Sequence, residues 1–410
     1  MLAGGTALGQ AMVLLASPVL TRLFTTDEFG LLGLYTTFVL MAGMVTSARY
    51  ELAIPSASDD REAAYLATVS LLLIVPISAM AMLVLMGLKT NSWLGYGEYP
   101  GEGVAVLFVA LLVGGAFSVG RYWLIRSEEF ALISQIAPLQ QGGRVVSQVS
   151  LGFAGFGWMG LALGDLIGRL VGTGRVMKAS VREIVQHLAP IRRSDLSRAA
   201  SKFRRFPLLI APSSFFDKLG ALIPLPLIAQ QYGLGAAGLF TLVQRALGLP
   251  SALIGQSVAD VFHARIGKLK NEPRTVEKLL VKTAGWLLLV GVIPALVLVV
   301  AGPGIFSAVF GSDWNEAGRI AAAMTPWFVA ELAVSPISRV AYVFEGQHLK
   351  FVYDFLTLGL TIVVFLWGSA ADISVVSMVL VLSITNALTY IVYYFLLLRI
   401  VRKGSGPSVE

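Results

Sequence analysis

The chain has 410 residues, of which 56% are hydrophobic and 13% are charged, and its mean hydropathy is +0.77. These values exclude a soluble globular protein of this length and indicate a polytopic membrane protein. With no cysteine and three widely separated histidines, the sequence predicts no metal site and no cofactor.

A membrane-spanning helix needs about 20 mainly apolar residues, and twelve such segments follow one another along the chain. They are predicted near residues 3–21, 31–49, 63–88, 103–124, 130–153, 157–177, 205–230, 235–260, 280–302, 317–341, 349–370 and 374–399. The first segment lacks the charged region that opens a signal peptide. We therefore interpret it as the first membrane-spanning helix. A longer form of the chain would carry a basic cytoplasmic prefix before it.

The basic residues predict the orientation in the membrane. Of the 31 Lys and Arg residues, 24 fall in alternate loops and at the C-terminus, whereas Arg22, Lys89 and Arg319 fall on the opposite side. This asymmetry predicts that both termini are cytoplasmic. It also accounts for the net charge of +7 without a nucleic-acid partner.

One longer basic segment, 179–204, divides the spans into two sets of six. Its mixture of apolar and basic residues is typical of an amphipathic stretch on the cytoplasmic membrane surface. We interpret it as a linker between lobes 1–178 and 205–403, with a docking site for a partner protein as the alternative. Residues 404–410 are expected to be a disordered tail.

The two halves also share a short sequence pattern. The segment LTRLFTTDEFGLLGLY after the first span resembles IAQQYGLGAAGLFTLV after the seventh at a constant offset. The matched pairs are Phe24 with Tyr232, Gly30 with Gly238, Leu31 with Leu239, and Leu34 with Leu242. Because six spans return the chain to the same side, the repeat is parallel and predicts two lobes around a central pathway.

Several charged residues lie within the predicted spans. Asp217 and Lys218 stand side by side near the middle of the seventh span. A charge at the bilayer centre costs roughly 3 kcal/mol on insertion scales, so it is expected to face water or a partner. We interpret Lys218 as a cation of a polar pathway, while Asp217 either tempers that charge or titrates during transport.

The fifth span carries a polar face. Ser134, Gln141 and Gln148 recur every seven residues, and Arg144 follows three residues after Gln141. This face either packs on a polar helix or lines a water-filled cavity, and the cavity is favoured.

In the sixth span, Asp165 and Arg169 have the spacing of an intrahelical ion pair. They accompany a glycine every four residues from 160 to 172, which favours close helix packing over a substrate role for Arg169. Arg245 in the eighth span has no acid within one helical turn, which makes it a stronger binding candidate. Glu331, Asp165 and Asp217 are candidates for coupling to a proton or sodium gradient, although Glu331 is equally consistent with a buried neutral acid.

Several motifs carry a family resemblance. They are RLFTTDEFGLLGLY, RYELAIPSASDDREAA (49–64), FPLLIAPSSF (206–215), GLFTLVQRALGLPSALIGQSVADVFHARI (238–266), SPIS (335–338) and EGQ (345–347). In this order they resemble the oligosaccharide flippases of the polysaccharide-synthesis branch of the multidrug/oligosaccharidyl-lipid/polysaccharide (MOP) exporter superfamily. The resemblance implies a V-shaped, all-α membrane protein with two six-helix lobes. It also assigns Arg22 and Arg49, which otherwise read as ordinary interfacial arginines, to the lobe portal.

The resemblance further implies a function. Such a flippase moves an undecaprenyl-diphosphate-linked oligosaccharide from the cytoplasmic to the periplasmic leaflet of the bacterial inner membrane, for lipopolysaccharide, capsule or exopolysaccharide synthesis. Its expected partners are this glycan, membrane lipids, and polysaccharide polymerase and assembly proteins. We expect a cavity with Arg144, Lys218 and Arg245 to bind the diphosphate, because guanidinium groups bind phosphate oxygens in pairs.

Three other functions fit the sequence less well. An ion-coupled organic-cation antiporter of the same superfamily would share the fold, but its pathway should carry acids rather than cations. A glycosyltransferase, ligase or polymerase would need a larger extramembrane loop or an acidic catalytic cluster. A scaffold protein would not need the polar face of the fifth span. The sequence therefore predicts a transporter and not an enzyme.

Overall fold

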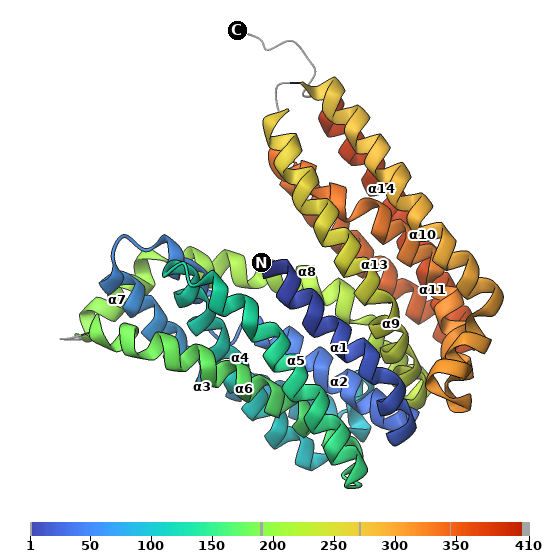
Figure 1. Cartoon of the computed structure of the whole chain (residues 1–410), viewed down its shortest axis with the longest axis horizontal. Helices are drawn as coiled ribbons and strands as arrows, with labels where there is room; N and C mark the ends of the chain where they lie inside the picture. Colours follow the sequence, from blue (N-terminus) through green and yellow to red (C-terminus); the bar gives the residue numbers. More distant parts are fainter. Residues whose placement is uncertain (1, 189–191, 270–271, 345, 404–410) are drawn as a thin grey trace. The chain divides into compact units, whose positions relative to one another are not determined.

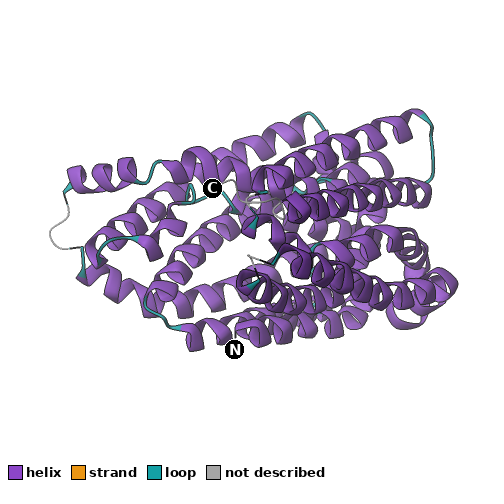
Figure 2. Cartoon of the chain, turned by 90° about the horizontal axis from the view of Figure 1, so that it is seen from above, coloured by secondary structure: helices purple, strands orange, loops and turns teal. Residues whose placement is uncertain are grey.

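The computed structural model describes residues 2–188, 192–269, 272–344 and 346–403, in which all regular elements are helices (Figure 2). The helices follow one another in the order drawn in Figure 1. The α-helices are α1 (Leu2–Leu23), α2 (Thr26–Gly43), α3 (Asp60–Thr90), α4 (Gly101–Arg126), α5 (Phe130–Phe153), α6 (Gly157–Gln186), α7 (Arg193–Lys202), α8 (Ala211–Leu222), α9 (Pro224–Lys268), α10 (Pro273–Phe310), α11 (Asn315–Val334), α12 (Val340–Val343), α13 (Gln347–Ala370) and α14 (Val375–Lys403). Short helical turns η1 (Tyr50–Ser56), η2 (Trp93–Glu98), η3 (Phe206–Ile210), η4 (Ser312–Trp314) and η5 (Pro336–Arg339) connect them.

Each of the twelve predicted spans corresponds to helical structure. The seventh and eighth predicted spans are joined within α9, where Gly233 has a φ of +83° that breaks the helical path. Glycine tolerates this backbone conformation because it has no Cβ. Eight helical segments of the described chain are long and apolar enough to cross a membrane. The helices α2, α5 and α6 are not among these segments, and α5 and α6 carry the charged residues discussed below.

The boundaries of the second span differ from the prediction. The helix covers Thr26–Gly43 rather than 31–49, because a capping box at its start satisfies two backbone amides. The Thr25 hydroxyl accepts from the Glu28 amide, and the Glu28 carboxylate accepts from the Thr25 amide. The helix ends before Arg49, whose left-handed backbone (φ +62°) directly precedes η1.

The predicted linker 179–204 is in part a continuation of α6, which extends to Gln186. The rest includes α7, which packs against α3. Ala199 is buried there in an apolar cluster with Ala63 and Trp123, and the Tyr50 hydroxyl donates to the Ala200 carbonyl at 3.1 Å. The described part of this segment is thus packed helix on the first unit. Residues 189–191 and the predicted tail 404–410 lie outside the described residues.

The chain forms two compact units, Met1–Gly238 and Leu239–Glu410. The first contains α1 to α8 and the beginning of α9, and the second contains the rest of α9 and α10 to α14. The lobes predicted on either side of the basic linker, 1–178 and 205–403, stay a prediction. The compact units divide at a different point because the beginning of α9 packs on α2.

Two glycines that the sequence repeat pairs with each other make this contact in the first unit. A Cβ added to Gly30 would lie 2.1 Å from the Leu234 carbonyl oxygen, and one added to Gly238 would lie 1.8 Å from the Thr26 carbonyl oxygen. The backbones of α2 and α9 therefore cross at a distance that only glycine permits.

The second unit is built around α11, which packs along both α10 and α14. At one end of α10 and α11, Gly302 and Gly318 bring the two backbones together. A buried apolar cluster that includes Leu287, Leu332 and Leu397 fills the opposite part of the unit.

We predict that Gly30→Ala destabilises the protein by roughly 1–3 kcal/mol, because the added methyl group must push α9 away from α2. Gly174→Ala in α6 is the matched control, since a Cβ there meets no atom within 4 Å. Alanine is the better helix former, so the control should be neutral or slightly stabilising. Thermal unfolding followed by fluorescence size-exclusion chromatography measures both, and equal midpoints would contradict the proposed crossing.

Candidate functional site

The helices α5 and α6 of the first unit approach each other along the predicted glycine repeat. A Cβ added to Gly164 would lie 2.8 Å from the Gln148 amide nitrogen, and one added to Gly168 would lie 2.5 Å from the Gln140 carbonyl oxygen. The glycines therefore serve close packing, as the sequence predicts. The partner they admit is α5, whose Arg144 Cβ would lie 2.7 Å from a Cβ at Gly168.

This packing forms a charged cluster of two arginines and one aspartate. Arg169 Nε lies 2.6 Å from Asp165 Oδ2, which confirms the predicted intrahelical pair. Arg144 Nε of α5 lies 3.3 Å from Asp165 Oδ1. The Tyr35 hydroxyl of α2 donates to Asp165 Oδ2 at 3.1 Å, so a third helix also holds the aspartate. The Asp165 side chain is only 3% exposed.

The cluster borders a polar cavity of about 140 Å³ between α4, α5 and α6. Its lining residues are Gly114, Phe117, Gln140, Gln141, Arg144, Asp165, Gly168, Arg169 and Thr173. Two lining residues each have a buried side-chain atom without a hydrogen-bond partner in the described part of the chain, namely Gln141 Oε1 and Arg144 Nε. With both arginines and the aspartate ionised, the cluster carries one excess positive charge. The cavity is therefore suited to an anion.

The polar face predicted on α5 is divided between two roles. Gln141 and Arg144 border the cavity, whereas Gln148 is fully buried and donates to the Leu161 carbonyl of α6 at 2.8 Å. Gln148 therefore joins two helices and does not line the cavity. The Ser134 hydroxyl donates to the Ala131 carbonyl of its own helix at 2.7 Å, and Ser134 is not among the residues that line the cavity.

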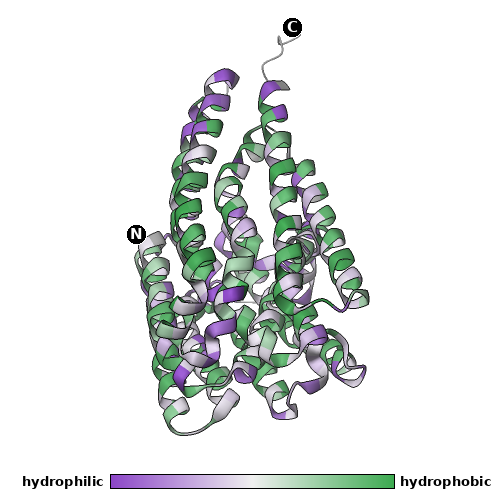
Figure 3. Ribbon diagram, turned by 90° about the vertical axis from the view of Figure 1, so that its right-hand side faces the viewer, coloured by the Kyte–Doolittle hydropathy of each residue, from purple (hydrophilic) through white to green (hydrophobic). Residues whose placement is uncertain are grey.

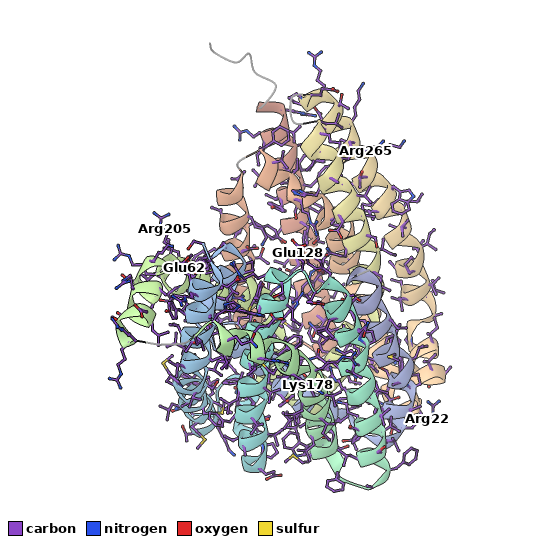
Figure 4. All side chains as sticks on the ribbon, turned by 60° about the vertical axis from the view of Figure 1, so that its left-hand side comes forward. Arg22, Glu62, Glu128, Lys178, Arg205 and Arg265 are labelled. Carbon is purple, nitrogen blue, oxygen red and sulfur yellow. The ribbon has the colours of Figure 1, made fainter. Side chains whose placement is uncertain are left out.

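The two arginines assigned to the portal lie at element ends. Arg22 is exposed at the end of α1, where Nη1 donates to the Pro18 carbonyl at 2.5 Å. It lies at the opposite end of the first unit from Glu62 and Arg205 (Figure 4). Arg49 is mostly buried and lies 3.6 Å from Glu51, whose carboxylate accepts from the Ser47 hydroxyl at 2.5 Å. Burial raises the pKa of Glu51 above its usual value.

The remaining predicted site residues are not among those that line this cavity. Lys218 in α8 is exposed, and the side chain of Asp217 lies outside the described residues. Arg245 is half-buried in α9 and belongs to the second unit. Glu331 is half-buried in α11, within electrostatic range of Tyr390 in α14.

Sequence reasoning missed several residues of the cluster. In the sequence, Tyr35 and Thr173 lie among mainly apolar residues, and no local pattern identifies them as site residues. Gln140 could have been predicted, because it is next to Gln141 and because the glycine repeat of α6 must pack against a residue of another helix. Its side chain would meet a Cβ at Gly172 at 2.1 Å.

The family model for polysaccharide biosynthesis proteins matches residues 19–319. The chain belongs to this family. Among curated proteins, none matches the sequence.

Solved structures share the fold. A multidrug resistance MATE family transporter of the MOP superfamily, in an inward-facing conformation, has a TM-score of 0.71 at 14% identity, covering 98% of this chain and 96% of its own. The lipid II flippase MurJ, in an inward closed conformation, has a TM-score of 0.74 at 13% identity, covering 98% and 90%. A MOP superfamily transporter from Pyrococcus furiosus has a TM-score of 0.62 at 14% identity, covering 99% and 95%.

The polysaccharide biosynthesis protein thus has the all-α membrane fold of MOP-type transporters. In the described part of the chain, no group of three or more His, Cys, Asp or Glu side chains is arranged to hold a metal ion.

The charge balance of the cluster predicts unequal effects of two substitutions. Asp165→Asn leaves two guanidinium groups without a carboxylate inside the helix bundle, and should destabilise the protein by roughly 3–5 kcal/mol. Arg144→Gln leaves the neutral pair of Asp165 and Arg169, and should be tolerated far better. Thermal unfolding in detergent measures both, with Asp195→Asn of α7 as control, because the partner of its side chain is the exposed Arg198, at 3.8 Å. Equal losses for the two cluster variants would contradict the assigned charge balance.

Proposed function

We propose that this protein is a flippase that moves a polyprenyl-diphosphate-linked oligosaccharide from the cytoplasmic to the periplasmic leaflet. The observation that carries the proposal is the excess positive charge of Arg144 and Arg169 over Asp165 beside a small polar cavity. The polysaccharide biosynthesis family and the fold shared with a lipid II flippase support the same substrate class.

The cluster would bind the diphosphate rather than the sugars. A cavity of about 140 Å³ holds only a few water-sized groups, so a phosphate fits while an oligosaccharide does not. Guanidinium groups bind phosphate oxygens with paired, charge-assisted hydrogen bonds. Because a diphosphate in hydrocarbon is prohibitively costly, even one compensating charge lowers the barrier to its passage.

The other basic residues are proposed contacts along the route of the headgroup. Lys218 and Arg245 would contribute further positive charge, and Arg22 and Arg49 would receive the phosphates near the membrane surface. Passage would occur by alternating access of two lobes, as in other transporters built from repeats. The topology that we propose places both termini in the cytoplasm and the protein in the bacterial inner membrane, based on the asymmetry of Lys and Arg.

Coupling to a proton or sodium gradient is proposed through Glu331. Asp165 already holds two arginines, and this engagement makes it a poor cation site. Glu331 is half-buried in α11, within a segment apolar enough to cross a membrane, where an acidic side chain is a candidate for a functional role.

The second candidate is an ion-coupled organic-cation antiporter, which the fold of the MATE transporter favours. That function requires a carboxylate in the pathway that is open to a cation. In the described cluster, the carboxylate is outnumbered by guanidinium groups, so the anionic substrate is preferred.

We predict that Arg144→Gln combined with Arg169→Gln lowers transport of a fluorescent lipid-linked oligosaccharide at least tenfold, because the diphosphate loses its paired donors. The assay uses proteoliposomes, in which transported glycan becomes protected from an external lectin. Arg198→Gln in α7, an exposed arginine, is the control and should transport normally.

A separate arm tests the proposed route. Native mass spectrometry of the purified protein should detect a bound polyprenyl-diphosphate glycan, and Lys218→Gln should reduce its retention. Normal transport in the double arginine variant, together with saturable binding of organic cations, would overturn the flippase proposal in favour of the antiporter.

A further inference from the structure

The second unit contains an apolar groove that the charged cluster does not use. It lies between α10 and α14, and its floor is α11. The groove forms because α11 packs closely along both neighbours, whereas α10 and α14 contact each other much less. Its volume is about 600 Å³, within the range of roughly 300–1,000 Å³ typical of ligand sites.

Small residues form much of the groove wall. Ala284, Gly285, Ala330 and Ala387 line it, and a Cβ added to Gly285 would meet no atom within 4 Å. Larger apolar side chains stand at the rim, and Leu288 is half exposed there. At Gly285 the groove therefore has open space for at least a methyl group and is not filled by side chains.

The length of the groove identifies its occupant more closely. The lining residues of α10 extend from Val281 to Val299. At 1.5 Å per residue this is about 27 Å, close to the thickness of roughly 30 Å of the bilayer hydrocarbon core. An acyl chain of a phospholipid belongs to one leaflet and fills about half of that thickness. A single long chain fits the groove better.

One end of the groove is basic. Lys278 and Lys282 lie three residues before Val281 and Gly285 on the same side of α10, and both lysines are exposed. Neither lysine has an ion-pair partner in the described part of the chain. The nearby Arg402 is neutralised by Glu277 at 2.6 Å. Figure 3 shows that the helices of this unit are apolar along most of their length and hydrophilic at the end near the C-terminus.

We propose that this groove binds the chain of a polyprenyl phosphate, with the phosphate at Lys278 and Lys282. The proposal rests on the proposed function for the identity of the lipid carrier, and it adds a binding site for the carrier's chain on the second unit. Because the chain enters the groove from lipid and not from water, burial of apolar surface contributes little. The affinity arises from close van der Waals contact with the wall of small residues and from ion pairs between the phosphate and the two lysines.

The test is photo-cross-linking with undecaprenyl phosphate that carries a diazirine along its chain, using the intact protein in nanodiscs. We expect cross-links in peptides that contain 281–299 and 387–394. Gly285→Leu should reduce them at least tenfold, because the new side chain fills open groove space without a clash. Gly359→Leu in α13 is the matched control, since Gly359 also has open space around its Cβ. Lys278→Gln with Lys282→Gln should lower labelling severalfold without altering the groove.

Two outcomes would overturn this inference. One is labelling that spreads evenly over the lipid-facing helices or is unchanged by Gly285→Leu. The other is competition by phosphatidylglycerol as strong as competition by unlabelled undecaprenyl phosphate, which would indicate a general lipid groove. The transport assay separates the two proposals. Localised labelling without glycan transport would contradict only the flippase function. Transport without localised labelling would contradict only the groove site.

Discussion

The close approach of α5 to the glycine face of α6 is the constraint on which the charged cluster depends. Without side chains at Gly164 and Gly168, the α5 backbone comes near enough for Arg144 to reach an aspartate on the neighbouring helix. A charge within a membrane span is tolerated only with a partner or water. Helix packing and charge compensation therefore depend on the same contact between α5 and α6, and a larger residue on this face of α6 would disturb both.

The ratio of charges gives the cluster its chemical character. Ion pairs at the ends of the first unit, such as Arg126 with Asp60, are balanced and partly exposed, so they contribute little to stability. Inside the bundle, Arg144 and Arg169 share a single carboxylate beside a polar cavity. An uncompensated charge in this setting is costly to maintain, and the proposed binding role would account for it.

The groove of the second unit differs in chemistry from the charged cluster of the first. It contains almost no polar surface, and its basic residues stand at one end of α10 instead of within the bundle. Small residues on three helices produce this shape, because α11 fills the space beneath α10 and α14 without closing the space between them. The two proposed sites thus differ in chemistry, since the cluster of the first unit is charged and the groove of the second unit is apolar.

The sequence by itself determined the membrane environment, the twelve helical segments, the Asp165 and Arg169 pair and the use of glycines for packing. Hydropathy and helical spacing are local properties, so they can be read along one chain. Only the tertiary structure decided that Arg144 shares Asp165, that Tyr35 joins them, that Gln148 joins two helices, and that α7 packs on α3. The tertiary structure also shows that Gly30 and Gly238, which the sequence repeat pairs, lie where α2 and α9 cross. These contacts depend on which helix faces which and in what register, and that is fixed by packing between segments far apart in the sequence.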